Sequence, residues 1–249
     1  MSETILQEHK QEAGQVTIRD MREEDIQQIV DEFNNTWSMK DSDGDDISAL
    51  DAQHFVMHYL SGTTRGRVAQ MGGRFMGVTL LSVDQEPLVV PDAASRLEAV
   101  DAQLKASAEG SKNLANMRVW HRLEEDVEAG IGINESAQAE LKLFLVSSRA
   151  RGHGVGGKLW RDMLAHLDER DVERFYLHTD SSCDVSFYDH IGMECLAARM
   201  GADHPEEADD RGGFYDDIFV YASPVSQQLD RWGLSMSSQE PTSDGGGAR

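Results

Sequence analysis

The chain has 249 residues, and 23 Lys and Arg against 45 Asp and Glu give a formal net charge of −22 at pH 7. Nucleic-acid binding needs a basic surface, so this balance argues against a nucleic-acid partner. Residues 52–64 are the longest stretch free of Asp, Glu, Lys and Arg, which is too short for a transmembrane helix. Since the amino terminus has no apolar leader and the chain has two cysteines, we expect a cytoplasmic protein without membrane contact.

Both ends of the chain are polar and aperiodic. Residues 1–13 lack hydrophobic periodicity, and residues 233–249 are rich in Gly and Ser, so we expect both segments to be disordered. The region between them, 14–232, is expected to fold as one domain, because 39% hydrophobic residues are enough to form a core.

The first third of the domain has alternating strand and helix patterns. A strand is predicted at 16–19, helices at 22–33 and 51–60, and strands at 67–71 and 75–83 that turn at Gly72-Gly73. Residues 87–134 are then rich in Ala, Leu, Glu and Lys and predict two helices broken near Gly110.

The remainder alternates again. It predicts a strand at 139–148, a helix at 155–167, a strand at 173–179, a short helix at 185–190 and two last strands at 193–200 and 214–222. A helix between two of these strands indicates a parallel pair, so the fold class is an α/β sheet of mixed direction.

A glycine-rich loop, RGHGVGGK at 151–158, lies between a predicted strand and an amphipathic helix. Glycines allow a ligand to approach the backbone, and the first amides of a helix attract an anion. The loop therefore predicts a phosphate-binding site, and three phosphate-binding patterns compete for it.

Two of these patterns fit badly. Gly152, Gly154 and Gly157 match the dinucleotide pattern G-x-G-x-x-G, but residues 147–151 separate Val146, the last apolar residue of the strand, from the first glycine. The P-loop pattern also matches, except that Leu159 replaces the Ser or Thr that binds magnesium. A nucleotide enzyme remains one alternative.

The third pattern, R-x-x-G-x-G, is formed by Arg151, Gly154 and Gly156. With its flanks it resembles the GNAT (general N-acetyltransferase) superfamily. The opening VTIRDMREEDIQQI resembles the first strand and helix of that family, AELKLFLVSSRARGHGVGGKLW resembles its acetyl-CoA motif, and LHTDSSCDVSFYDHIGME resembles the strand and helix that follow. The resemblance implies a largely antiparallel sheet whose two central parallel strands splay apart, flanked by helices. A helical insertion over 84–135, between the third and fourth strands, departs from the family.

The resemblance implies an enzyme that transfers an acetyl group from acetyl-CoA to a primary amine by direct attack in a ternary complex. The amine must lose a proton and the leaving thiolate must gain one. The family places Tyr188 as general acid and Glu140 as candidate general base. The residues expected at acetyl-CoA are Leu145, Val146, Arg151, Gly152, Gly154, Val155, Gly156 and Gly157, with Ser181 where the family often has Asn. A non-catalytic acetyl-CoA-binding domain is the alternative function.

Other features concern the acceptor and the metals. The acidic loops at 41–46 and 203–210 predict a cationic acceptor, such as a polyamine, an aminoglycoside or a lysine side chain. No metal is expected, because 41–46 lacks calcium-loop spacing and His54 and His58 lack a zinc signature. Cys183 and Trp120 are interpreted as structural residues. The insertion could cap the acceptor pocket or form a homodimer contact.

Overall fold

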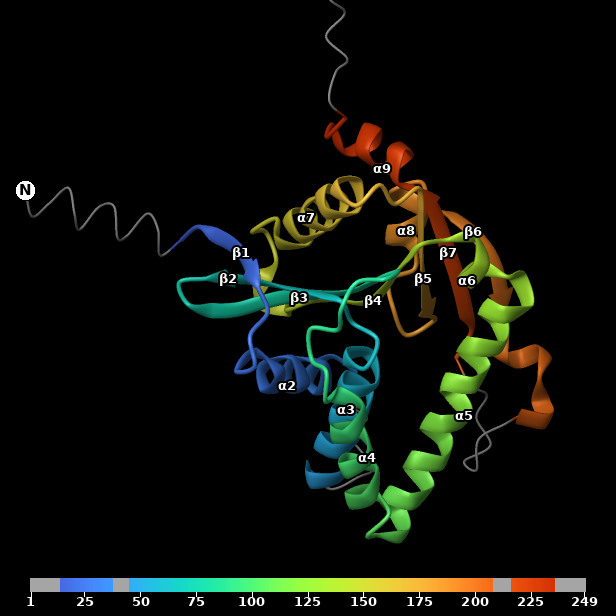
Figure 1. Cartoon of the computed structure of the whole chain (residues 1–249). Helices are drawn as coiled ribbons and strands as arrows, with labels where there is room; N and C mark the ends of the chain where they lie inside the picture. Colours follow the sequence, from blue (N-terminus) through green and yellow to red (C-terminus); the bar gives the residue numbers. More distant parts are fainter. Residues whose placement is uncertain (1–13, 38–44, 208–215, 236–249) are drawn as a thin grey trace, which may run out of the picture.

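The computed structural model describes residues 14–37, 45–207 and 216–235. These residues form a single seven-stranded sheet in the order β1-β2-β3-β4-β5-β7-β6 (Figure 1). The strands are β1 (Val16–Asp20), β2 (Arg65–Met71), β3 (Arg74–Val83), β4 (Ala139–Val146), β5 (Arg174–Asp180), β6 (Glu194–Arg199) and β7 (Ile218–Pro224). The mixed α/β class expected from the sequence is confirmed.

The two central strands are the only parallel neighbours among the described strands. The pairs β1–β2, β2–β3, β3–β4, β5–β7 and β6–β7 are antiparallel. In contrast, β4 and β5 run parallel and pair only through Ala139 with Phe175 and Glu140 with Tyr176. Beyond Glu140 the two strands separate, so the expected splay is confirmed and its closed end lies at that residue.

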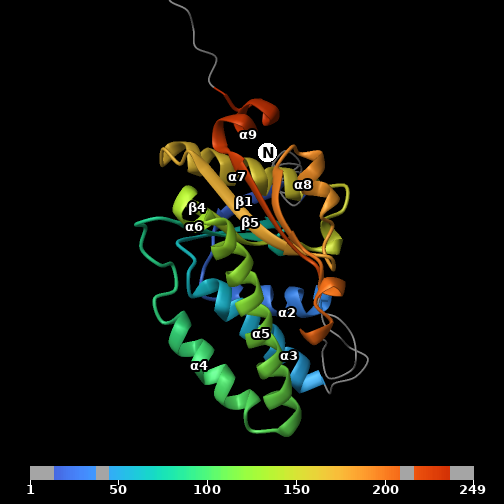
Figure 2. The same ribbon diagram turned by 90° about the vertical axis from the view of Figure 1, so that its right-hand side faces the viewer.

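Helices cover both faces of the sheet. In Figure 1 and Figure 2, α7, α8 and α9 lie on one face and α2, α3, α4 and α5 on the other. The helices are α2 (Asp25–Trp37), α3 (Asp45–Leu60), α4 (Ala93–Leu104), α5 (Ala108–Ile131), α6 (Ile133–Ser136), α7 (Val155–Glu169), α8 (Ser186–His190) and α9 (Val225–Trp232). In the described part of the chain, no helix has both the length and the apolar character that crossing a membrane requires.

A separate hydrophobic cluster lies on each side. Ile29 of α2 and Leu60 of α3 pack against Leu80 on one face, and Trp160 of α7 packs with Phe175 on the other. All five side chains are fully buried. Since burial of one large apolar side chain stabilises the fold by about 1.5–3 kcal/mol, these faces hold the helices on the sheet.

The predicted hairpin forms at Gly72 and Gly73, whose φ angles of 56° and 76° lie in the left-handed region. Glycine adopts this region without the steric cost that a Cβ would add. The hairpin joins β2 to β3 as the sequence predicted.

The insertion contains the two predicted helices, α4 and α5, but the break precedes Gly110. The side chain of Ser107 caps α5 by accepting a hydrogen bond from the Gly110 amide. A Cβ on Gly110 would lie 2.3 Å from the carbonyl oxygen of Leu104. Glycine is therefore needed because two helix ends meet closely, and not because the helix ends at that position. A homodimer contact through the insertion stays a prediction.

Helix α9 was not predicted. It has only two turns, and it directly follows β7 at Pro224, so its periodicity is too short to distinguish from a polar tail. Val225 and Leu229 pack into the same hydrophobic cluster as Trp160. Two further boundaries were wrong, since α3 begins at Asp45 and β7 at Ile218.

Candidate active site

The splay leaves one edge of β4 without a strand partner. Leu145 and Val146, predicted to bind the pantetheine arm, lie beyond the last residue of β4 that pairs with β5. Leu145 is buried, whereas Val146 is exposed. Their backbone groups on this edge can therefore pair with an extended ligand, as a sheet edge pairs with an added strand.

The glycine loop follows directly and opens α7. Gly152 and Gly154 have φ angles of 77° and 67°, and open space surrounds the position of a Cβ at both. Gly154 is the N-cap of α7 without a side-chain cap. The first amides of a helix have no partner within it, so the amides of Val155, Gly156 and Gly157 are available to an anion.

Two observations disfavour the P-loop and dinucleotide patterns. Lys158, which would be the P-loop lysine, donates a hydrogen bond from Nζ to the carbonyl oxygen of Val16 at 3.1 Å. It therefore ties α7 to β1. A dinucleotide fold needs several adjacent parallel strands, whereas β4 and β5 form the one parallel pair among the described strands. Both nucleotide-binding patterns are therefore disfavoured.

Tyr188 lies in α8 beside the splay. Its ring is half-buried and packs against Tyr221 and Phe187, with ring centroids 5.4 Å away in each case. Burial, together with the negative charges of neighbouring groups such as Asp180, raises the pKa of Tyr188. The phenol is therefore protonated at neutral pH and can donate a proton.

A cavity of about 730 Å³ joins the splay to the helices on the opposite face. Its ionisable lining residues are Asp51, Lys142, Glu124, His178, Asp180 and Asp216, and its aromatic ones are Phe33, Trp37, Phe55, Tyr59, Trp120, Phe144 and Tyr188. Trp120, which was interpreted as a structural residue, is half-buried and lines the cavity. Helical spacing does not show that its face of α5 borders a cavity. The insertion thus forms one wall of the cavity.

Glu140 lies at the closed end of the splay, inside a charged cluster. Lys142 Nζ donates to Glu140 Oε2 at 2.6 Å. His178 Nδ1 lies 3.9 Å from Glu140 Oε1. Glu140 itself does not line the cavity, whereas Lys142 and His178 do. Any proton transfer from a ligand to Glu140 would therefore pass through another group or water.

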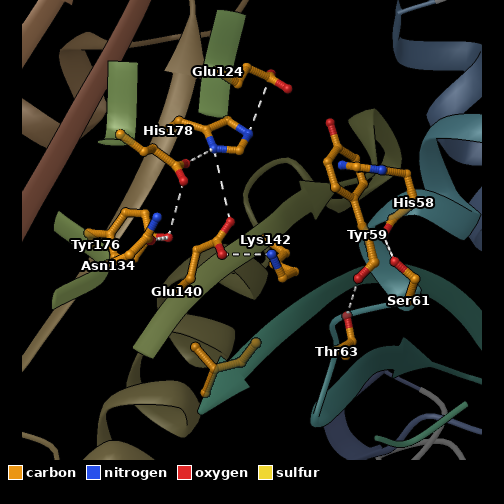
Figure 3. Close-up of polar contacts among 12 residues, drawn as sticks. His58, Tyr59, Ser61, Thr63, Glu124, Asn134, Glu140, Lys142, Tyr176 and His178 are labelled. Atoms are coloured by element: carbon orange, nitrogen blue, oxygen red, sulfur yellow. Dashed lines mark hydrogen bonds and ion pairs between the residues drawn. The ribbon is translucent and has the colours of Figure 1, made fainter. Parts of the chain in front are cut away.

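His178 is at the centre of this cluster (Figure 3). Its Nδ1 lies 2.6 Å from Glu128 Oε1, and its Nε2 lies 3.4 Å from Glu124 Oε1. Burial lowers the pKa of His178, but the charge of Glu124, the hydrogen bond to Glu128 and the charge of Glu140 outweigh it and raise the pKa to about 9. His178 is therefore an imidazolium at neutral pH.

The same cluster includes one of two groups of described residues that are close enough to share a metal ion. The candidate ligand atoms of Glu128, Glu140 and His178 lie within 4.8 Å of one another. Each already has a hydrogen bond or an ion pair inside the cluster, so the residues also satisfy one another as charges. The expectation that the protein has no metal stays a prediction.

His54 and His58 pack against the insertion. The His58 ring stacks on His121 of α5 with centroids 3.8 Å apart, and His54 Nδ1 lies 2.8 Å from Asp101 Oδ1. Burial lowers the pKa of His58 to about 3. The stacked rings are not among the potential metal sites of the described residues, which agrees with a packing role.

The remaining predicted residues have partners or lie apart from the cavity. Ser181 Oγ donates to Asp216 Oδ1 at 2.8 Å and joins the ends of β5 and β7; its place in an acetyl-CoA site stays a prediction. Cys183 lines the cavity, and burial raises the pKa of its thiol, which disfavours a thiolate nucleophile. Arg151 is exposed at the glycine loop. Residues 41–44 and 208–210 of the acidic loops at 41–46 and 203–210 fall outside the described residues.

Sequence reasoning missed Glu124 and His178. Both line the cavity, yet the first belongs to the insertion and the second to a strand that was considered only for its pairing. The alternation of polar His178 and Asp180 along β5 was the one available signal. The contact partners of both residues are distant in the sequence, so local patterns do not indicate them.

Comparison with known proteins agrees with this geometry. The model of the acetyltransferase (GNAT) family matches residues 26–193, and no curated protein matches significantly. A mosquito arylalkylamine N-acetyltransferase like 5b has a TM-score of 0.52 and 17% identity, over 84% of this chain and 99% of that one. The Escherichia coli ribosomal-protein-S18-alanine N-acetyltransferase has a TM-score of 0.43 and 12% identity, over 84% of this chain and 94% of that one.

A third solved structure, a GNAT family acetyltransferase from Elizabethkingia anophelis with acetyl-CoA bound, has a TM-score of 0.43 and 12% identity over 84% of this chain and 97% of that one. At 17% identity, the similarity to the mosquito protein supports the fold alone. The family match, in contrast, covers more than half of the sequence and includes β4, the glycine loop and Tyr188. The chain therefore belongs to the GNAT acetyltransferase family and is an acyltransferase.

Proposed function

We propose that the protein is an N-acetyltransferase that transfers the acetyl group of acetyl-CoA to a primary amine by direct attack in a ternary complex. The observation that carries this proposal is the cavity itself, which reaches from Tyr188 through the splay between β4 and β5 to the helices on the other face. Two substrates approaching from opposite faces of the sheet can meet there.

On the α7 side, the chain offers a site for CoA. The amides of Gly152, Gly154 and Val155 to Gly157 would hold the diphosphate, with Arg151 beside them. The free edge of β4 at Leu145 and Val146 would hold the pantetheine arm, and an amide on that edge would polarise the thioester carbonyl. In this arrangement the acyl group would lie near Tyr188.

On the opposite face, covered by α2, α3, α4 and α5, the amine must become neutral before it attacks. A lysine-like ammonium has a pKa of about 10.4, so a base is needed at neutral pH. Glu140 accepts this proton through water, since it does not line the cavity. The amine nitrogen forms the new C–N bond, the C–S bond breaks, and Tyr188 donates its proton to the departing thiolate. The acidic residues of the cavity favour a cationic amine as acceptor.

A non-catalytic acetyl-CoA-binding domain is the second candidate. It is favoured by the ion pair between Glu140 and Lys142, because a carboxylate that is held in this way is not free to act as a base. The two functions share the CoA site and differ only in turnover.

Binding and turnover are therefore tested separately. Acetyl-CoA should raise the melting temperature, whereas NAD and Mg-ATP should not. Release of free thiol is then measured over a panel of amines. Tyr188→Phe should lower kcat by about 10²–10⁴-fold and leave acetyl-CoA affinity unchanged. The control is Tyr221→Phe, since Tyr221 packs on Tyr188 but does not line the cavity.

The outcomes distinguish the candidates. If the wild type binds acetyl-CoA but releases no thiol with any amine, the binding domain is the correct function. If Tyr188→Phe keeps full kcat, Tyr188 is not the acid. Stabilisation by NAD or Mg-ATP alone would contradict both candidates.

A further inference from the structure

The inserted helix α5 brings an unusual set of charges to the acceptor side of the cavity. Glu124 and Glu128 of α5 meet Glu140 and Lys142 of β4 and His178 of β5 (Figure 3). All five side chains are at most 22% exposed. Buried charges need partners, because the interior solvates them poorly.

The carboxylates of this cluster outnumber its cations. Glu128 and Glu140 each have a short contact of 2.6 Å, with His178 and Lys142 respectively. Glu124 has longer contacts, at 3.4 Å to His178 Nε2 and 3.1 Å to His121 Nδ1. Three carboxylates thus face one imidazolium and one ammonium, and His121 adds a hydrogen bond to Glu124. Of the three carboxylates, Glu124 is the farthest from its cationic partner.

Glu124 is also the one glutamate of the three that lines the cavity. Its side chain is only 7% exposed. Although burial raises the pKa of a carboxyl group, the charge of His178 and the hydrogen bond from His121 lower that of Glu124 overall. The inserted helix therefore directs an ionised carboxylate at whatever occupies the cavity.

The surroundings of Glu124 define the occupant. Trp120, one turn earlier on α5, and Tyr59 and Phe55 of α3 are its aromatic neighbours in the cavity wall. Aromatic faces accept methylene groups and also attract cations. Over the whole lining, Asp51, Glu124, Asp180 and Asp216 stand against Lys142 and His178. A cation on an apolar chain matches these residues.

The compensating cation cannot be the reacting nitrogen. That nitrogen has to be neutral when it attacks, so it does not balance Glu124 through the reaction. The two groups also belong to different parts of the cavity wall: Glu124 is on α5 and contacts His178 within β5, whereas Tyr188 is on α8, which follows the end of β5. A second cationic group on the acceptor can occupy the position near Glu124 while the first amine reaches the thioester.

We propose that the acceptor is a diamine or polyamine and that Glu124 of the inserted helix is its specificity-determining residue, which binds the cationic group that is not acetylated. This inference rests on the proposed function, whose acceptor side it specifies. Asp51 and Asp216, at other points of the lining, can bind further charges of a longer polyamine.

The test compares 1,4-diaminobutane with butylamine, which have the same chain and differ in one cationic group. Binding of each to the CoA-bound protein is measured by isothermal titration calorimetry, and kcat/KM is measured by thiol release. The wild type should bind the diamine at least tenfold more tightly. Glu124→Gln should remove this preference by raising the Kd and KM for the diamine at least tenfold, while values for butylamine change less than twofold.

A matched control is available on the same helix. Glu125→Gln removes the same charge from an exposed neighbour on α5 and should leave both amines unaffected. The melting temperature and CoA affinity of each variant verify its fold.

Each result has a definite meaning. Equal binding of the two amines by the wild type overturns the inference without any variant, and so does an equal loss in Glu125→Gln. If the wild type prefers the diamine in binding and Glu124→Gln removes this preference, but no amine is acetylated, the proposed function fails and the binding role of Glu124 stands. If butylamine and the diamine are acetylated with equal kcat/KM, the proposed function stands and the inference fails.

Discussion

The protonated state of His178 makes folding stability depend on pH in the alkaline range. An unfolded histidine has a pKa of about 6.5, and the glutamates around His178 raise its folded pKa to about 9. The folded state thus binds a proton more tightly, so the stabilisation is complete below pH 6.5 and is lost as the pH rises through 9. Because the side chain is only 16% exposed, solvent screens this effect weakly.

The magnitude follows from the two pKa values. A shift of 2.5 units corresponds to about 3.4 kcal/mol at low pH, since each unit is worth about 1.36 kcal/mol. At pH 7 about 2.6 kcal/mol of this remains, and at pH 10 less than about 0.1 kcal/mol remains. The cluster should therefore lose about 2.5 kcal/mol of stability between pH 7 and pH 10.

The assay is urea unfolding at pH 7, 8, 9 and 10. Because lysines and tyrosines also titrate in this range, the wild type is compared with His178→Gln, and the difference between their curves isolates the imidazole. NMR titration of the His178 ring measures the pKa directly, and Glu128→Gln should lower it. Parallel stability curves for wild type and His178→Gln, or a ring that titrates near pH 6.5, would refute the reasoning.

Two further predictions concern His58, which stacks on His121 of the insertion, and Gly154 of the glycine loop. His58, with a folded pKa of about 3, binds protons more weakly than in the unfolded chain, so the folding stability should fall as the pH drops below about 6.5, by about 2 kcal/mol at pH 5. In urea unfolding, His58→Gln should lose less stability than the wild type between pH 7 and pH 5. An identical loss of stability in both proteins would show that His58 is not its cause. Gly154→Ala introduces a side chain at φ 67° and should cost about 1–2 kcal/mol and weaken acetyl-CoA binding in calorimetry. The control is Gly130→Ala, at a helical position with open space around the Cβ, which should stabilise the protein by up to about 1 kcal/mol. If Gly154→Ala is as stable as the wild type and binds acetyl-CoA as tightly, the loop conformation has no role in binding.

The insertion links these effects to function. Helix α5 provides Trp120 and Glu124 to the cavity, contacts His178 through Glu128, and stacks His121 on His58 of α3. Val100, Leu104, Leu114 and Met117 join α4 and α5 in a hydrophobic cluster beside Phe55. The family sheet thus carries an added wall that is held by both apolar packing and charge, and this wall borders the cavity.

Local patterns in the sequence were sufficient for most of the elements and for the glycine loop that opens α7. The glycine loop could be interpreted from the chain alone, because the positive φ angles at Gly152 and Gly154 and the amides that open α7 are properties of a short segment. Helix α5 could likewise be predicted from its own periodicity. The periodicity of α5 does not indicate that Trp120 lines the cavity.

The tertiary structure decided what depends on distant segments. The splay begins after Glu140 because β4 and β5, separated by α7, pair through two residues each, and no local pattern defines that length. The position of Glu124 beside His178 depends on how an inserted helix docks on strands that follow it in the chain. Contacts of this kind arise from packing and charge pairing between elements, whereas sequence periodicity reports only which face of one element is apolar. The sequence alone therefore determined the fold class and the glycine loop, and the folded chain decided the charge cluster and the shape of the cavity.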